Sequence, residues 1–335
     1  MEQVLQDRIG EYLLPYVEDF IFDELSDSYL EKAGIADILS GVPVPIRKSE
    51  LSGGLSTLTI AKNMAFIIGC DINFKHRDNY VAYILRTFTA EFVKPLLNEG
   101  IEAAAKEDYN YALICFRGAL LIDPESVDAL YCYGRACKDA YETGEGEEYI
   151  GRFKAESLEA FEKVTLKKPD FDLGYYFLGY AYLNLGLYVK AQLTWKSFME
   201  LSENEEQKVE VQEWLDKLVE PVKIEQGYNH ILSGRYNEGI DILSGYMEDE
   251  RFNTWWPLWY YLGVAHKALG DSETAEKDFI QVLKLSPSNI ETMKELVELY
   301  EAGGDAQRAE KYKGKIEIVK SNMEKDRAEK QSHLS

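Results

Sequence analysis

The stretch GYYFLGYAYLNLGLYVKAQLTW, residues 174–195, decides the fold. It combines five tyrosines with three glycines and a tryptophan in 22 residues. Two small residues, Gly179 and Ala191, lie 12 positions apart, and large residues stand at helical spacing around both of them. Small residues let two helices approach closely while large residues fill the contact beside them. The stretch therefore predicts a helical hairpin.

The same spacing recurs along the chain. The pattern has a small residue, a bulky residue four positions later and an apolar residue three positions after that. It occurs at Ala112, Phe116, Ala119 with Pro124; at Ala191, Trp195, Phe198; and at Ala275, Phe279, Val282 with Pro287. Large–small pairs stand at Tyr133-Gly134, Leu178-Gly179 and Leu262-Gly263, and the glycines of the last two lie 12 positions before Ala191 and Ala275. This pattern resembles the 34-residue tetratricopeptide repeat (TPR). The resemblance implies an all-α fold, a right-handed α–α superhelix (solenoid) with a concave face.

Six repeats fit this frame, near residues 93–126, 127–171, 172–205, 220–253, 256–289 and 290–323. The second carries 11 extra residues, because Gly134 stands 23 rather than 12 positions before its small partner Ser157. Eleven residues are about three helical turns. We expect the insertion to lengthen both helices and to place the hairpin tip at 142–148. Residues 203–221 are expected to contain the end of the repeat-three helix and a linking helix stopped by Pro221.

Residues 1–92 do not match the repeat, and we expect them to form a helical N-terminal cap. A helix is predicted over 2–29, with Pro15 as a kink or break. The Val-Pro arm, residues 42–46, should be extended, because each proline restricts the residue before it. A turn at 52–54 and helices over 56–70 and 78–97 should follow. Residues 324–335 are expected to form a polar C-terminal tail.

The resemblance also separates packing positions from groove positions within each repeat. It implies that Tyr175 and Tyr182 pack between helices. The residues expected to face the concave groove are Tyr131, Arg135, Lys138, Tyr176, Tyr180, Asn184, Tyr228, Tyr260, Tyr261 and Lys267. Tyr and Arg dominate binding hot spots. Two interpretations stay open: the groove holds an external protein or peptide, or its tyrosines pack on each other or on the chain's own N-terminal part.

Composition and motifs limit the function. Asp and Glu number 59 against 37 Lys and Arg, a net charge of −22, which disfavours nucleic-acid partners. The longest apolar run, residues 64–70, is too short for membrane insertion. The beginning of the chain lacks the pattern of a secretory signal, and four cysteines are too few for a disulfide framework, so we expect a cytoplasmic protein with reduced thiols. No HExxH, GxxxxGK[ST] or GxSxG motif occurs. We predict no catalytic residue, metal site or cofactor.

Three functions fit these observations. The first is a non-catalytic adaptor or scaffold that binds a protein or peptide through the tyrosine-rich groove. The second is a peptide-sensing intracellular regulator that acts on a second protein. The third is a structural, self-assembling repeat protein. A contact of the Val-Pro arm, residues 42–46, with the protein's own surface is compatible with all three.

Overall fold

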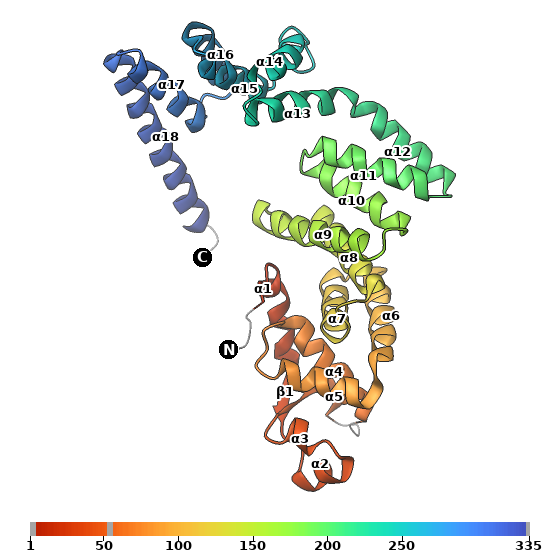
Figure 1. The fold of residues 1–335 in the computed structure, drawn as a ribbon. Helices are drawn as coiled ribbons and strands as arrows, with labels where there is room; N and C mark the ends of the chain where they lie inside the picture. The colour runs from red at the N-terminus through yellow and green to blue at the C-terminus, as the bar shows by residue number, and fades with distance from the viewer. Residues whose placement is uncertain (1–4, 52–55, 333–335) are drawn as a thin grey trace. The chain divides into compact units, whose positions relative to one another are not determined.

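The computed structural model describes residues 5–51 and 56–332, with side chains up to Lys325. Helices dominate it, and the described residues contain one two-stranded sheet (Figure 1). The all-α prediction is confirmed. The chain divides into two compact units, Met1–Val211 and Gln212–Ser335, with the boundary inside helix α12.

The first part of unit 1 is less helical than the sequence predicts. Its elements are α1 Gly10–Leu13, η1 Leu14–Asp19, β1 Phe20–Asp23, α2 Asp27–Ala33, α3 Ala36–Leu39, β2 Val44–Arg47, η2 Lys48–Glu50, α4 Thr57–Cys70, α5 Arg77–Phe88 and η3 Ala90–Phe92. The prediction of one helix over 2–29 is wrong. Pro15 lies in the first turn of a 3₁₀ helix, and strand β1 follows it. The predicted turn at 52–54 lies outside the described residues.

Strand β1 exists because the Val-Pro arm pairs with it. β1 and β2 are antiparallel, with Phe20 opposite Arg47 and Asp23 opposite Val44. Val44 is fully buried, the Tyr80 hydroxyl donates to the carbonyl of Pro43 at 2.6 Å, and β2 packs on α4. The arm is thus part of the packed N-terminal region.

The N-terminal region shares its core with the first two hairpins. Helix α4 is almost wholly apolar and crosses α7 so closely that a Cβ on Gly69 would lie 2.1 Å from the carbonyl oxygen of Ile114. One hydrophobic core runs from Ile9 to Ala160. Residues 1–92 are therefore continuous with the repeats in packing, and the boundary between compact units falls far later in the chain than residue 92.

Three helical hairpins complete unit 1. They are α6 Val93–Ala104 with α7 Tyr109–Ile122, α8 Val127–Thr143 with α9 Glu147–Lys167, and α10 Asp172–Asn184 with α11 Tyr188–Leu201. Helix α12, Glu205–Lys217, begins at the end of the unit. Helices α8 and α9 have 17 and 21 residues, against 13 and 14 in α10 and α11. The second hairpin is therefore four residues longer on one side and seven on the other, which accounts for the insertion.

Unit 2 contains three more hairpins, drawn in teal to blue in Figure 1. They are α13 Val219–Leu232 with α14 Tyr236–Leu243 and η4 Ser244–Tyr246, α15 Trp256–Ala268 with α16 Ser272–Leu285, and α17 Ile290–Ala302 with α18 Ala306–Ser332. The prediction that Pro221 stops a linking helix is wrong. Pro221 lies in the first turn of α13, where a missing backbone N–H breaks no helical hydrogen bond.

One contact repeats in five hairpins and identifies the repeat type. In each, a glycine of the first helix lies so close to a large side chain of the second helix that a Cβ would meet it at 3.1 Å or less. The pairs are Gly100 with Phe116, Gly134 with Phe161, Gly179 with Trp195, Gly227 with Leu243, and Gly263 with Phe279. The partner lies 16 residues further on in four pairs and 27 in the second, a difference equal to the insertion. The hairpins are TPR-type repeats.

Candidate functional site

The predicted groove residues of the second hairpin form contacts inside unit 1. The ring of Tyr131 packs against Phe171 and Phe177 at centroid distances of 5.1 and 5.9 Å. The Arg135 guanidinium lies 4.3 Å from the centre of Phe177 and donates to the Tyr131 hydroxyl at 3.4 Å. Tyr131 also borders a pocket of about 310 Å³ between α6 and α8, lined in part by Lys94. Tyr131 and Arg135 thus lie close together, as predicted from their spacing, but most of their contacts are with each other and with Phe171 and Phe177.

Tyr176 and Tyr180 converge on one carboxylate. The Tyr176 hydroxyl donates to Glu210 of α12 at 2.8 Å, and the Tyr180 hydroxyl donates to the other oxygen of the same group. Tyr176 is only 9% exposed, and Tyr180 lies edge-on to Trp195 at 4.9 Å. Burial, followed by the hydrogen bond to Glu210, raises the pKa of both phenols. Both hydroxyls therefore stay protonated and serve as donors within unit 1.

Lys138 and Asn184 also have partners in the same unit. The Lys138 ammonium forms an ion pair with Glu142 one helical turn away, at 2.6 Å. The Asn184 amide donates to the Tyr141 hydroxyl at 3.2 Å. These two side chains therefore contribute to the surface of the second and third hairpins.

Three of the four predicted residues of unit 2, the tyrosines, line an open aromatic pocket. Tyr228 of α13 stacks on Tyr261 of α15 at 4.8 Å and 18°, and Tyr260 lies edge-on to Tyr261 at 5.6 Å. These rings line a pocket of about 290 Å³, and all three are half-buried. We call this the unit-2 aromatic pocket; its lining is Tyr228, Trp255, Trp256, Pro257, Tyr260, Tyr261 and Glu291.

Two lining residues, Trp255 and Trp256, were not among the predicted site residues. Each is 37% exposed, and Trp256 lies edge-on to Tyr260 at 6.2 Å. They stand at the start of α15, where Pro257 occupies the first turn. The Trp-Trp-Pro run at the start of α15 is a sequence signal for an exposed aromatic site, because no preceding helical turn covers indoles at that position. The repeat frame hid that signal because it assigns groove positions only from the fifth residue onward.

A row of glutamates on α17 borders the pocket. Glu291 is a lining residue. Glu295 and Glu298 follow on the same helix. The ammonium of Lys267, on α15, lies 2.8 Å from the carboxylate of Glu295 and 2.6 Å from that of Glu298. Lys267 is therefore neutralised by its neighbours. Burial and the charges of Glu295 and Glu291 raise the pKa of Tyr260 to about 12, so its hydroxyl is a donor at neutral pH.

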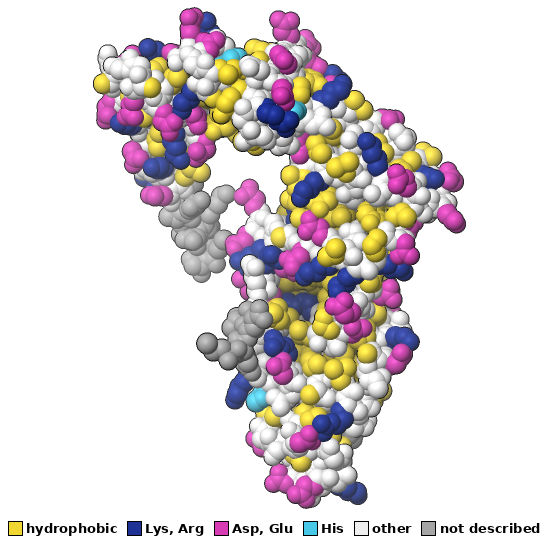
Figure 2. Space-filling model, viewed as in Figure 1, with side chains coloured by type: hydrophobic (Ala, Val, Ile, Leu, Met, Phe, Trp, Pro, Cys, Tyr) yellow, Lys and Arg dark blue, Asp and Glu magenta, His cyan; other side chains and the backbone are white. Residues whose placement is uncertain are grey.

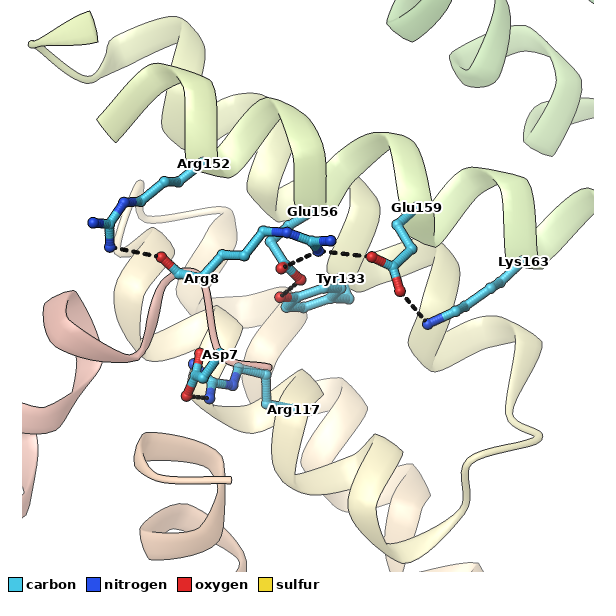
Figure 3. Close-up of polar contacts among 8 residues, drawn as sticks. All are labelled: Asp7, Arg8, Arg117, Tyr133, Arg152, Glu156, Glu159 and Lys163. Carbon is cyan, nitrogen blue, oxygen red and sulfur yellow. Dashed lines mark hydrogen bonds and ion pairs between the residues drawn. The ribbon is translucent and has the colours of Figure 1, made fainter. Parts of the chain in front are cut away.

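The lengthened second hairpin has a clear structural role, shown in Figure 3. It holds the N-terminal segment, residues 5–13, against α9. The Arg152 guanidinium donates to the carbonyl of Arg8 at 3.0 Å, and Arg8 forms ion pairs with Glu156 and Glu159 at 2.9 and 2.7 Å. Near the hairpin tip, Tyr149 packs edge-on against Tyr12 at 5.0 Å.

A second contact anchors the same segment on α7. Arg117 is 5% exposed and pairs with Asp7 at 2.5 Å. A cavity of about 380 Å³ lies beside these groups. Because Asp7, Arg8, Arg117 and Glu156 are paired with one another or with Tyr133, this site holds the chain's own N-terminal segment rather than presenting open charges.

Surface charge, cysteines and helix composition bear on other kinds of site in the described part of the chain. Acidic and basic side chains are interspersed on the face of the protein that Figure 2 shows. Within residues 5–51 and 56–332, no group of three or more His, Cys, Asp or Glu side chains is placed to hold a metal ion. All four cysteines are unpaired. None of the helices in these ranges is both long enough and apolar enough to cross a membrane.

Comparison with known proteins returned TPR structures. No family model and no curated protein matches the sequence. Similar solved structures include the P58(IPK) TPR domain, at 13% identity over 91% of this chain and 86% of that one, with a TM-score of 0.45. YrrB, described as a TPR protein with an unusual peptide-binding site, is 15% identical over 64% of this chain and 96% of its own, with a TM-score of 0.32. A thermophilic TPR protein of Thermus thermophilus, TTC0263, is 19% identical over 72% and 98%, with a TM-score of 0.23. The repeat type of this chain rests on its own hairpin contacts.

Proposed function

We propose that this protein is a non-catalytic repeat scaffold that binds a segment of a partner protein, and that the unit-2 aromatic pocket receives a lysine or arginine side chain of that segment. The observation that supports the proposal is the pocket itself. Five aromatic rings surround it, two of them indoles that are 37% exposed, and a carboxylate, Glu291, stands at its border. Clustered exposed apolar surface of this kind commonly marks an interaction site.

The pocket's chemistry suits a cation. The faces of Trp and Tyr attract Lys and Arg, with about 0.5–2 kcal/mol for each good contact. The nearby Lys267 is already paired with Glu295 and Glu298, so it does not repel an incoming positive charge strongly. A chain with net charge −22 also attracts basic segments over distance. An acidic or apolar segment would gain less from each of these features.

The groove residues of unit 1 are assigned a supporting role in this proposal. Tyr176 and Tyr180 donate to Glu210, and Arg135 stacks on Phe177. These contacts stiffen the third hairpin and the helix that follows it. A partner that touches unit 1 would meet this assembled surface, in which Tyr131 borders the pocket beside Lys94.

An array of ten-residue peptides tests the proposal. Each peptide has one defined central residue, which is Lys, Arg, Leu, Pro or Glu, and randomised residues on both sides of it. The full-length protein is the probe. We expect the retained peptides to be enriched in Lys and Arg. The affinity of a retained peptide should fall about 30-fold in Trp256→Ala and in Tyr261→Ala, which corresponds to a hot-spot loss of about 2 kcal/mol.

The control is Tyr29→Ala, which removes an exposed ring of α2 in unit 1 and should leave the affinity unchanged. Enrichment of Leu, Pro or Glu at the central position would overturn the choice of a cation. Equal affinity in wild type and both pocket variants would overturn the site. Light scattering on the same protein separates a self-assembling array, which must form oligomers, from a scaffold for other proteins.

A further inference from the structure

Another cavity lies in unit 1, far along the chain from the unit-2 aromatic pocket. It has a volume of about 310 Å³ and opens between the end of β2 and helices α4, α6 and α7. Polar and charged groups share its wall with apolar ones, among them Phe66 and Leu96, which are 6% and 3% exposed.

Arg47, the last residue of β2, brings a positive charge to this wall without a carboxylate partner. Its guanidinium carbon lies 4.8 Å from the centre of Phe66, 5.0 Å from Phe20 and 6.0 Å from Tyr111. Within the described residues Arg47 forms no side-chain hydrogen bond or ion pair, and its Nε is buried without a partner. The three aromatic rings pack around this guanidinium, and its N–H groups are left without a hydrogen-bond acceptor among the described residues.

Glu50 brings the opposite charge to the same cavity. Its carboxylate accepts a hydrogen bond from the Asn63 amide at 2.8 Å, and it forms no ion pair with any described residue. The other two charges of the wall neutralise each other, since Lys62 lies 3.0 Å from Glu99. One cation and one anion that do not pair with each other therefore line a single cavity.

We propose that this cavity binds a small zwitterion, a free α-amino acid in its chemical class, and that the N-terminal region is a ligand-responsive part of the protein. The carboxylate of the ligand receives two N–H bonds from the edge of Arg47, the geometry in which arginine binds carboxylates best. The ammonium of the ligand lies against Glu50. The side chain of the ligand packs on Phe66 and Leu96.

This assignment follows from charge balance. A simple anion would satisfy Arg47 and leave Glu50 beside a second negative charge, and a simple amine would do the reverse. Arg47 and Glu50 are both partly buried, unpaired charges lose stabilisation as they are removed from water, and a ligand that carries both charges offsets both costs. The volume is at the lower end for ligand pockets, which fits a ligand of amino-acid size.

The test is isothermal titration calorimetry of the full-length protein with each of the twenty free L-amino acids. For every amino acid that binds, its analogue without the amino group and its analogue without the carboxylate are titrated as well, together with inorganic phosphate. We expect one-to-one binding of at least one amino acid, and at least tenfold weaker binding of both analogues. Arg47→Gln and Glu50→Gln should each weaken binding at least tenfold.

Two further variants keep the test decisive. Glu50→Gln leaves the ring contacts of Arg47 intact, so it reports on the site even where Arg47→Gln fails to fold by circular dichroism. Arg86→Gln removes an arginine from an exposed ion pair with Asp37 in the same unit and should bind like the wild type. The proposal is overturned when no amino acid binds at millimolar concentration, when phosphate or the deaminated analogue binds as tightly, or when Glu50→Gln has no effect.

Discussion

Tyr176 and Tyr180 of unit 1 stand at the same offsets from their repeat glycine as Tyr260 and Tyr228 of unit 2, and the surroundings of the two pairs differ. In unit 1, Tyr176 and Tyr180 of α10 donate to Glu210 and pack on rings of their own hairpin. In unit 2, Tyr228, Tyr260 and Tyr261 border an open pocket. A repeat position thus fixes the direction of a side chain relative to its helix, and the next segment of the chain decides whether it is covered.

The covering segments differ for a simple reason. After α11, a short connection leads directly into α12, which carries Glu210 to the two hydroxyls. After α14, the chain instead passes through η4 and a turn region before α15, and it delivers Trp255 and Trp256 to the pocket. The Glu210 carboxylate therefore accepts the hydroxyls of the unit-1 tyrosines, while two partly exposed indoles add to the pocket beside the unit-2 tyrosines.

The largest expected effect separates a tryptophan of the core from one of the pocket. Trp195 is fully buried against Gly179 and donates to the carbonyl of Tyr176 at 3.1 Å. Trp195→Ala should lower the free energy of unfolding by about 3–5 kcal/mol, because it leaves a large cavity and removes a buried hydrogen bond. Trp256→Ala, at a 37% exposed position, should change it by less than about 1 kcal/mol. Urea unfolding followed by circular dichroism measures both, and equal losses would contradict the distinction.

A smaller effect is expected at the glycine contact that defines the repeat. A Cβ at Gly179 would lie 2.1 Å from Nε1 of Trp195, which is held in place by its own hydrogen bond. Gly179→Ala should therefore destabilise unit 1 by about 1–3 kcal/mol. Gly151 of α9 has no atom within 4 Å of its Cβ position, so Gly151→Ala should stabilise the helix by about 0.5–1 kcal/mol. Thermal unfolding midpoints that move in the same direction would refute this reading of the contact.

Removing hydroxyl groups sharpens the comparison between the two tyrosine sets. The double change Tyr176→Phe and Tyr180→Phe deletes both donors to Glu210 and should cost about 1 kcal/mol of folding stability. Tyr261→Phe keeps the ring that stacks on Tyr228 and should cost nearly nothing. Chemical denaturation of the three proteins tests this, and a cost for Tyr261→Phe as large as that of the double variant would argue against it.

The smallest effect concerns acid stability. Burial raises the pKa of Glu99, but hydrogen bonds from Tyr111 and Lys62 outweigh it, so the pKa lies below its usual value. A carboxylate with a lowered pKa stabilises the fold above its ordinary pKa of about 4.3 and loses that contribution as the pH falls. The stability gap between wild type and Glu99→Gln should therefore be present at pH 7 and shrink at about pH 3. A gap that widens at low pH would contradict the sign.

Much of the architecture was predictable from the sequence, because it depends on neighbours within one hairpin. The contact of Gly179 with Trp195 corresponds to a fixed spacing of 16 residues in the sequence, and the insertion corresponds to the same spacing enlarged by 11 residues. Helical periodicity is local, so a pattern over about 34 residues carries it.

The failures involve partners that lie far apart in sequence. Phe20–Asp23 forms a strand only because Val44–Arg47 lies beside it, although its own pattern suited a helix. The same holds for Arg8, whose partner Glu156 on α9 is 148 residues away. No local sequence pattern predicts that the lengthened second hairpin binds the N-terminal segment.

The sequence by itself therefore determined the all-α fold built of helical hairpins. Only the tertiary structure decided which of the tyrosines are covered, where the N-terminal segment is held, and which charges remain unpaired in the cavity beside Arg47. The physical reason is that periodicity sets the direction of a side chain, while burial and pairing depend on segments that the fold brings in from elsewhere.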